Sequence, residues 1–140
     1  MSTPIADSTN RLAWLLDGLE LDGVRFSVLL SDDGLRMAHS PGITRDEAER
    51  FAAAASGLRS LGKALGEFCG PAGNPVRQNM TEYDNGMILI TSAGAGAQLG
   101  VATTSEVDLA LVAHRMNELA TRVGRELGVA PRHEGARHDS

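Results

Sequence analysis

The sequence predicts an α+β domain in which three amphipathic helices cover a five-stranded, mostly antiparallel sheet. Three observations predict this class. The expected elements follow one another in the order helix, two strands, helix, three strands, helix. The connections between strands are of hairpin length, which antiparallel strands allow and parallel strands do not. A sheet of this size needs cover on its faces, and three amphipathic helices can supply it on both.

The length and composition are those of one globular domain. The 140 residues are 42% hydrophobic and 22% charged, close to the globular average. We expect a flexible arm over residues 1–9, one domain over residues 10–128 and a disordered tail over residues 129–140, because both ends are polar. Cys69 is the only cysteine, which excludes a disulfide within the chain.

Charge and hydropathy exclude several classes of partner. The formal net charge is −5, which argues against nucleic acid and anionic membranes, because both are bound through basic surfaces. No apolar run reaches about 18 residues, so we expect no membrane span. The opening stretch MSTPIADSTN lacks the basic-then-apolar pattern of a secretory signal. We therefore expect a cytoplasmic protein.

The first part of the chain predicts a helix followed by a hairpin. Ser8 or Asn10 is a candidate helix cap. The helix that follows has apolar residues at helical spacing, namely Leu12, Leu15, Leu16 and Leu19. Alternating apolar residues predict strands over residues 24–30 and 35–39, joined by a Ser-Asp-Asp-Gly turn.

A capping box opens the long central helix. Thr44 is followed three residues later by Glu47, so that each side chain can bond the other's backbone N–H. The helix is expected over about residues 45–67, and the Gly/Pro-rich stretch 70–75 ends it. A strand is expected over residues 76–83.

The last part predicts a hairpin and a final helix. Residues 87–91 form the most β-like run in the chain, and residues 98–102 return beside it after a glycine-rich turn. Ser105 is the expected cap of an amphipathic helix over about residues 106–127.

Two glycine-rich stretches resemble phosphate-binding motifs but lack the necessary context. Residues 57–64 read GxxxxGK, yet Ala64 stands where the magnesium-binding Ser or Thr belongs, and the stretch lies inside an expected helix. Residues 94–100 have the spacing GxGxxxG, one residue longer than the dinucleotide fingerprint, and a strand follows. We interpret the first as packing glycines and the second as a hairpin turn.

Residue types that carry catalysis or bind metals occur singly. His39 and His114 are far apart in the sequence. Cys69 has no evident orienting partner, so a hydrolase or transferase built on it is a minor alternative. We therefore expect no catalytic residues, no metal, no cofactor and no enzymatic activity.

The long helix carries a stripe of small residues. Its larger apolar side chains, which we expect to face the sheet, are Phe51, Leu58, Leu61 and Leu65. The stripe on the opposite side, which carries no charge, consists of Ala53, Gly57, Ser60 and Ala64. Small side chains let another helix approach closely, so we predict that this stripe contacts a second copy of the chain across a two-fold axis. Alternatively, it is alanine-rich filler that reflects a coding bias.

The strand over residues 76–83 is a candidate for the edge of the sheet. A bare edge invites pairing with another chain. We therefore add three alternating residues of this strand to the predicted homodimer interface, namely Val76, Gln78 and Met80.

Trp14 is a candidate partner contact. It falls nearly opposite the apolar stripe of the first helix, and exposed tryptophans are enriched at binding hot spots. Alternatively, Trp14 packs under the N-terminal arm or against the last helix.

Several stretches, in this order, resemble the roadblock/dynein light-chain family in its bacterial form. They are LAWLLDGL, FSVLLSDDGLRMAHSPGITRDEAERFAAAASGLRSLGKAL and YDNGMILITSAGAGAQLGVAT, followed by the amphipathic final helix. The resemblance covers about residues 10–128 and consists of hydrophobic and small-residue patterns. It implies a five-stranded antiparallel sheet with the long helix on one face and the two terminal helices on the other. It also implies dimers formed through the second helix and the third strand.

The resemblance further implies a regulatory partner. Bacterial proteins of this kind are often encoded beside a small Ras-like GTPase that they regulate or scaffold, and in actinobacteria they accompany a sensor-kinase-like protein. We therefore expect a homodimer, or a larger assembly, that binds such a GTPase and alters its nucleotide cycle. Arg59 is a candidate arginine finger, or else a solvated helix charge. A small-molecule sensor of profilin-like or PAS-like architecture is the alternative function, because a fold does not fix a function.

Overall fold

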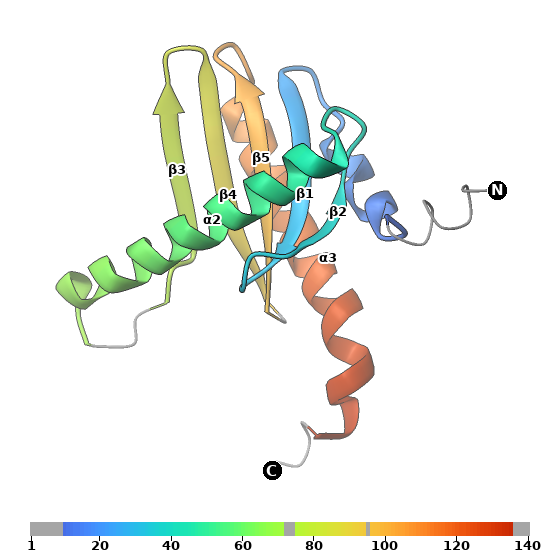
Figure 1. The fold of residues 1–140 in the computed structure, drawn as a ribbon, viewed down its shortest axis with the longest axis vertical. Coiled ribbons are helices and arrows are strands. Elements are labelled where there is room, and N and C mark those ends of the chain that lie inside the picture. Colours follow the sequence, from blue (N-terminus) through green and yellow to red (C-terminus); the bar gives the residue numbers. More distant parts are fainter. Residues whose placement is uncertain (1–9, 72–74, 95, 136–140) are drawn as a thin grey trace.

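The computed structural model describes residues 10–71, 75–94 and 96–135. The elements follow the predicted order (Figure 1). They are the 3₁₀ helix η1 (Ala13–Leu19), β1 (Val24–Ser31), β2 (Arg36–His39), α2 (Arg45–Leu65), the 3₁₀ helix η2 (Gly66–Cys69), β3 (Gln78–Tyr83), β4 (Gly86–Gly94), β5 (Ala97–Thr104) and α3 (Leu109–Gly135).

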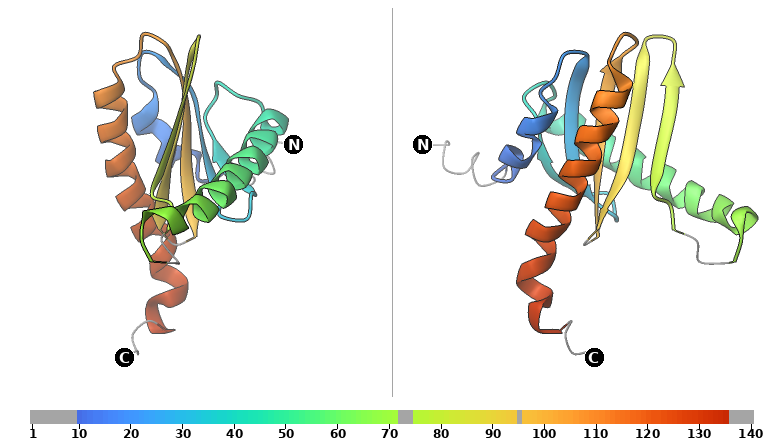
Figure 2. Two further views of the ribbon diagram at one scale, coloured as in Figure 1. Left: turned by 90° about the vertical axis from the view of Figure 1, so that its left-hand side faces the viewer. Right: turned by 180° about the vertical axis from the view of Figure 1, so that it is seen from behind.

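The strands form one antiparallel sheet in the order β2-β1-β5-β4-β3, so that β2 and β3 are its outer edges. Seen edge-on, the sheet has α2 on one face, and η1 and α3 on the other (Figure 2, left). The expected α+β fold, with the long helix on one face and the two terminal helices on the other, is confirmed.

The core is divided between the two faces of the sheet. The larger cluster lies between the sheet and the helices η1 and α3, and the smaller lies under α2. Successive side chains of β4 point to opposite faces of the sheet and so contribute to both clusters. Leu89 belongs to the larger cluster and Ile90 to the smaller. The central strands are therefore buried on both faces, which is why β4 appears in the sequence as a nearly continuous apolar run.

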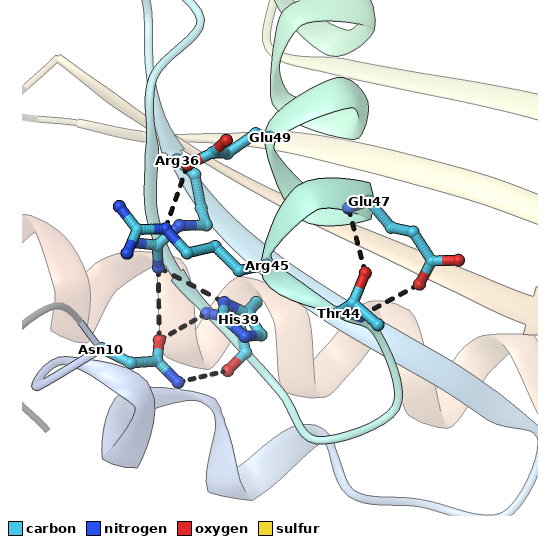
Figure 3. A network of polar contacts seen from close by, with 7 residues as sticks. All are labelled: Asn10, Arg36, His39, Thr44, Arg45, Glu47 and Glu49. Carbon is cyan, nitrogen blue, oxygen red and sulfur yellow. Dashed lines mark hydrogen bonds and ion pairs between the residues drawn. The ribbon is translucent and has the colours of Figure 1, made fainter. Parts of the chain in front are cut away.

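Local sequence signals place α2 and the turns correctly. The Thr44 hydroxyl accepts the Glu47 backbone N–H at 3.1 Å, and the Glu47 carboxylate accepts the Thr44 N–H at 3.0 Å, so the capping box is confirmed (Figure 3). These bonds with Thr44 lower the pKa of the Glu47 carboxyl. Gly34 has a φ of +92° in the first hairpin, as its Asp-Gly turn predicts. A Cβ on Gly86 would overlap the Thr103 carbonyl oxygen, so this turn also requires glycine.

The two terminal helices differ from expectation. The first is a short 3₁₀ helix that begins after Leu12 without a side-chain cap. Asn10 does not cap it because its side chain binds β2 instead, and Ser8 lies outside the described residues.

The last helix is capped by Asp108 rather than Ser105. The Asp108 carboxylate accepts the Leu111 backbone N–H at 3.2 Å. The chain must first bring Val107 into the larger cluster beside Gly23, and the helix begins only after that turn. It continues to Gly135, past the expected end at residue 127. It therefore overlaps the tail expected over residues 129–140, of which the last five lie outside the described residues.

Candidate interaction surface

The C-terminal part of α2 extends beyond the sheet. The helix crosses the sheet obliquely, and its last turns project past β3 (Figure 1; Figure 2, right). Large apolar side chains on this part are mostly exposed: Leu61 at 67%, Leu65 at 65% and Phe68 of η2 at 78%. Because exposed apolar surface is unfavourable in water, this projection is a candidate contact surface.

The expectation that Leu61 and Leu65 face the sheet was wrong. Phe51 and Leu58 do pack into the smaller cluster. Beyond Leu58 the helix reaches the margin of the sheet, where Gly62 lies against the segment that leads into β3. A Cβ on Gly62 would stand 3.0 Å from Val76 Cγ2. The close approach that we expected from this glycine is thus made within the chain.

The stripe of small residues lies on the surface. Ala53, Gly57, Ser60 and Ala64 are all exposed, and a Cβ on Gly57 would have no neighbour within 4 Å. The helix is therefore open to a close approach along this side. Its contact with a second copy stays a prediction.

The strand β3 forms an outer edge, as expected. It pairs with β4 from Gln78 opposite Thr91 to Tyr83 opposite Gly86, and no described strand lies on its other side. Gln78 and Met80 are exposed, while Val76 precedes the strand and is half-buried. Met80 is 51% exposed.

We define the α2–β3 surface as the stripe of small residues together with Leu61, Leu65, Phe68, Val76, Gln78 and Met80. The C-terminal part of α2 lies near the segment that leads into β3, where Gly62 meets Val76, whereas Ala53 lies beside Gly34 of the first hairpin. Sequence reasoning assigned Leu61 and Leu65 to the core and did not select Phe68. The position of Phe68 just before the Gly/Pro-rich break is the only local signal for it.

Arg59 anchors α2 to the first hairpin. Its Nε lies 3.6 Å from Asp32 Oδ1, and that carboxylate also accepts the Gln98 amide at 3.3 Å. The Ser56 hydroxyl donates to the Asp32 carbonyl at 2.9 Å. Arg59 thus contacts an acidic group of its own chain, and its role as a partner contact stays a prediction.

Trp14 lies on the other face of the sheet from α2. Its side chain is 46% exposed, and the Arg122 guanidinium of α3 lies 5.2 Å from the ring centroid. Trp14 was expected to contact a partner, the N-terminal arm or the last helix, and the contact with Arg122 is one with the last helix. The structure does not bring Trp14 together with the α2–β3 surface.

A polar network covers the β2 edge of the sheet (Figure 3). The Asn10 side chain accepts the His39 backbone N–H at 3.0 Å and donates to the His39 carbonyl at 3.2 Å. Arg36 Nη1 lies 3.4 Å from Asn10 Oδ1 and 3.3 Å from His39 Nδ1. On the α2 side, Arg45 pairs with Glu49 at 3.1 Å.

The electrostatics of this network favour a neutral His39. Burial, followed by the positive charges of Arg36 and Arg45, lowers the pKa of His39 from its ordinary 6.5, against the opposing effect of Glu49. A guanidinium can only donate, so the Arg36 contact requires an unprotonated Nδ1.

The two glycine-rich stretches have ordinary structural roles. Residues 57–64 lie inside α2, and Gly94 and Gly96, with φ of +72° and +76°, lie in the turn from β4 to β5. The interpretation as a hairpin turn is confirmed, and the interpretation as packing glycines holds for Gly62 against Val76 but not for Gly57, where a Cβ would meet nothing within 4 Å. In the described part of the chain, no three His, Cys, Asp or Glu side chains are grouped as a metal site would require. Within the same part, no helix is long and apolar enough to cross a membrane.

Comparison with known proteins identifies the family. The model of the Roadblock/LC7 domain matches residues 12–103, from the start of the first helix to the end of the sheet. The chain belongs to the Roadblock/LC7 domain family. This membership places it among regulatory and scaffold domains. No curated protein matches the chain.

Solved structures of roadblock domains share the fold. A Roadblock/LC7 domain from Streptomyces avermitilis is 36% identical, with a TM-score of 0.76 over 83% of this chain and 97% of that one. MglB from Myxococcus xanthus is 17% identical, with a TM-score of 0.69 over 90% and 96%. An MglB with a tetrameric arrangement is 18% identical, with a TM-score of 0.73 over 84% and 88%. The two MglB structures show likeness of fold alone.

Proposed function

We propose that this roadblock domain forms a homodimer through the α2–β3 surface, and that the dimer is a non-enzymatic regulator or scaffold of a small Ras-like GTPase in bacterial signalling. The projection of α2 beyond the sheet is the observation that carries the proposal. A sensor-kinase-like protein is a further partner, and the cytoplasm is the expected compartment.

The exposed side chains of the projection support self-association. Burying a large apolar side chain stabilises a complex by about 1.5–3 kcal/mol before the entropic cost of association. Leu61, Leu65 and Phe68 all lie on this projection. An interface with two-fold symmetry would bury these side chains in both copies of the chain. The cost of leaving them in water therefore favours a dimer over the monomer.

The neighbouring features fit a two-fold contact. The exposed small residues, such as Gly57 and Ala64, allow a second helix to approach α2 closely. The free edge of β3 offers backbone groups to a second copy of the same strand, which would extend the sheet through both protomers. MglB, a relative in fold, has been solved in a tetrameric arrangement, so assemblies larger than a dimer are compatible with this architecture.

The GTPase part of the proposal rests on the family. The matched model covers the first helix, α2 and nearly all of the sheet with both of its edges, and this part is shared with a family of regulators and scaffolds. The chain has no intact phosphate loop of its own in α2, which suits a partner that acts on another protein's nucleotide. Arg59 and Trp14 are the candidate contacts, on opposite faces of the sheet.

The dimer is tested by adding charge to the stripe of small residues. The double variant Gly57→Glu, Ala64→Glu should convert a dimer into a monomer in size-exclusion chromatography with light scattering. Glu118→Ala, on the exposed side of α3, is the matched control and should leave the mass unchanged. A double variant that keeps the dimeric mass contradicts this interface.

The partner is tested by capture from lysate of the source cells. The tagged chain, incubated with either GDP or a non-hydrolysable GTP analogue, should retain a Ras-like GTPase preferentially in one nucleotide state, as read by mass spectrometry. Comparison with the monomeric double variant shows whether capture requires the dimer. Recovery of no GTPase in either state contradicts the regulatory function and leaves the dimer to be judged by its own test.

A further inference from the structure

The face of the sheet that carries α2 is left uncovered at the end of β3 and the start of β4 (Figure 1). A surface hollow of about 370 Å³ lies at this place. Its lining includes Ile88, which packs against the smaller cluster, and Ala102, which stands opposite Ile88 in the sheet. Arg25 and Tyr83, whose side chain is 59% exposed, also line it. Apolar surface is therefore open to water here as well as on the projection of α2.

The projection and the hollow lie at opposite ends of β3. α2 passes the start of the strand, where a Cβ on Gly62 would stand 3.0 Å from Val76 Cγ2 and 3.7 Å from Asn79 Nδ2. The hollow lies at the end of the strand, beside Tyr83. A symmetry operation that reverses the direction of β3 and keeps the face of the sheet therefore brings the projection of one copy to the hollow of the other.

Antiparallel pairing of two β3 edges is such an operation. Two identical strands pair in this way about a two-fold axis that passes through the sheet between them, so both α2 helices lie on one face. The Arg77 carbonyl accepts the Ser92 N–H at 3.0 Å, so the backbone groups of Arg77 point towards β4. Because the direction alternates along a strand, three residues of β3 direct their backbone groups outwards, namely Gln78, Met80 and Glu82.

A two-fold axis beside Met80 pairs all of these outward residues. Met80 then stands opposite its own copy, and Gln78 stands opposite the partner's Glu82. The Gln78 amide can donate to that carboxylate, and such cross-strand pairs stabilise a sheet. An axis beside either neighbour of Met80 leaves one outward residue of β3 without a counterpart in the partner's β3, so the Met80 register is favoured.

This register fixes where the partner's helix passes. Thr81 stands opposite the partner's Asn79, and Gly62 lies close to Asn79 within each copy. The partner's α2 therefore crosses the edge of β3 near Thr81 and continues over the uncovered face towards Tyr83. Leu65 and Phe68, which follow Gly62 on the projection, then reach the hollow.

The charges at the two places are complementary. Among the described residues, Arg25 alone carries a charge in the lining of the hollow, and Asp84 lies in the turn beside it. The projection carries Lys63 and Glu67, both of them exposed. Lys63 comes first along the chain and would pass Asp84 on the β3 side, while Glu67 would reach Arg25 of β1 beyond it.

We propose that the hollow beside Tyr83 receives the end of the partner's α2, with the partner's Leu65 and Phe68 lying on Ile88 and Ala102. The inference rests on the proposed dimer and adds a contact that the α2–β3 surface does not include. Each protomer donates one projection and accepts one, so the dimer makes this contact twice. The contact covers the hollow together with the side chain of Phe68, which is 78% exposed in the protomer.

Cross-linking of the full-length chain tests this contact, because the exposed Cys69 directly follows Phe68. Tyr83→Cys places a second thiol at the hollow, and a short bis-maleimide should join it to the partner's Cys69 in a covalent dimer. Asn85→Cys, at the same hollow, should give the same product while keeping the tyrosine ring. Glu82→Cys is the matched control, because this exposed side chain lies on the opposite face of the sheet and should give no product.

Light scattering on the same samples distinguishes this contact from the dimer itself. A dimeric mass without a cross-link from Tyr83→Cys or Asn85→Cys overturns the docking of the projection and leaves the proposed dimer in place. A monomeric wild type overturns both. A product that forms equally from Glu82→Cys, or that persists when Cys69→Ser is added, also overturns the docking, because the partner's projection is then not its source.

An exchange of charge tests the orientation of the docked helix. Arg25→Glu or Glu67→Arg alone should weaken the dimer about fivefold in sedimentation equilibrium, because each change brings like charges together. The double variant restores an opposite pair and should dimerise like the wild type. A double variant that dimerises more weakly than both single variants shows that the two groups do not face each other, and overturns the proposed contact.

Discussion

Phe51 of α2 lies directly over Gly100 of β5. A Cβ on Gly100 would stand 2.5 Å from Phe51 Cε2, so the ring occupies the space that any other residue at this position would fill. The ring also meets Phe26 edge-on, with centroids 5.4 Å apart. This contact fixes the N-terminal half of α2 on the sheet and thereby sets the direction in which the other half projects.

Gly100→Ala should therefore destabilise the fold. The added methyl group forces the Phe51 ring from its place, and overpacking of this kind costs about 1–3 kcal/mol. Urea unfolding followed by circular dichroism measures the change. Gly18→Ala, where a Cβ meets nothing within 4 Å, is the control and should stay within about 0.5 kcal/mol of wild type. If Phe51→Leu in the Gly100→Ala background recovers none of the loss, the contact is not its cause.

Charge on the projection should dissociate the proposed dimer without destabilising the fold. Leu65→Asp changes a side chain that is 65% exposed, so the unfolding midpoint of the isolated protomer should change little. The mass from light scattering should fall from twice 14.7 kDa to 14.7 kDa. Leu35→Asp, 64% exposed in the turn between β1 and β2, is matched in exposure and should keep the dimeric mass. Equal behaviour of the two variants would place the interface elsewhere.

Acid should weaken the fold through His39. Its pKa in the folded state is lowered from 6.5, so the unfolded chain binds the proton more readily. The stability is then fully present above about pH 6.5 and declines as the pH falls from there towards the lowered pKa. The difference in unfolding free energy between wild type and His39→Gln should therefore change over this range. An unchanged difference between wild type and His39→Gln across this range contradicts the role of His39.

Removing Arg122 should change the environment of the single tryptophan. The guanidinium lies 5.2 Å from the Trp14 ring, a geometry that contributes about 0.5–1 kcal/mol at an exposed site. Arg122→Ala should shift the intrinsic fluorescence and lower the unfolding free energy by up to that amount. Arg125→Ala removes a charge one turn further along α3 and should leave the emission unchanged. An identical spectrum in both variants contradicts the contact.

The parts of the fold that could be predicted from the sequence depend on local chemistry. The Thr44–Glu47 box, the Asp-Gly turn at Gly34 and the alternation along β4 each involve neighbours in the chain. The wrong assignments concern contacts between residues that are far apart in the sequence. Asn10 has the side chain of a helix cap, but it binds a strand 29 residues away, and nothing near Asn10 in the sequence signals this.

The projection of α2 could have been predicted by comparing the length of the helix with the width of the sheet. The helix has 21 residues, or about 31 Å, while five strands spaced by about 4.8 Å span about 19 Å between the outermost axes. A helical wheel assigns Leu61 and Leu65 to the same face as Phe51, but it does not show where the sheet ends. The ion pair between Arg59 and Asp32 could not be predicted from the sequence either, because it depends on how α2 is placed over the first hairpin.

The unequal edges of the sheet limit how far the protein can polymerise. Growth into a filament requires each copy to offer one strand edge to the copy before it and a different edge to the copy after it. Here the Asn10 amide bonds both backbone groups of His39 at the β2 edge, and no described strand pairs with the outer side of β3. In the proposed dimer, a contact between two copies of β3 would use that edge in both of them, so growth by strand pairing would end at a closed pair rather than an open fibre.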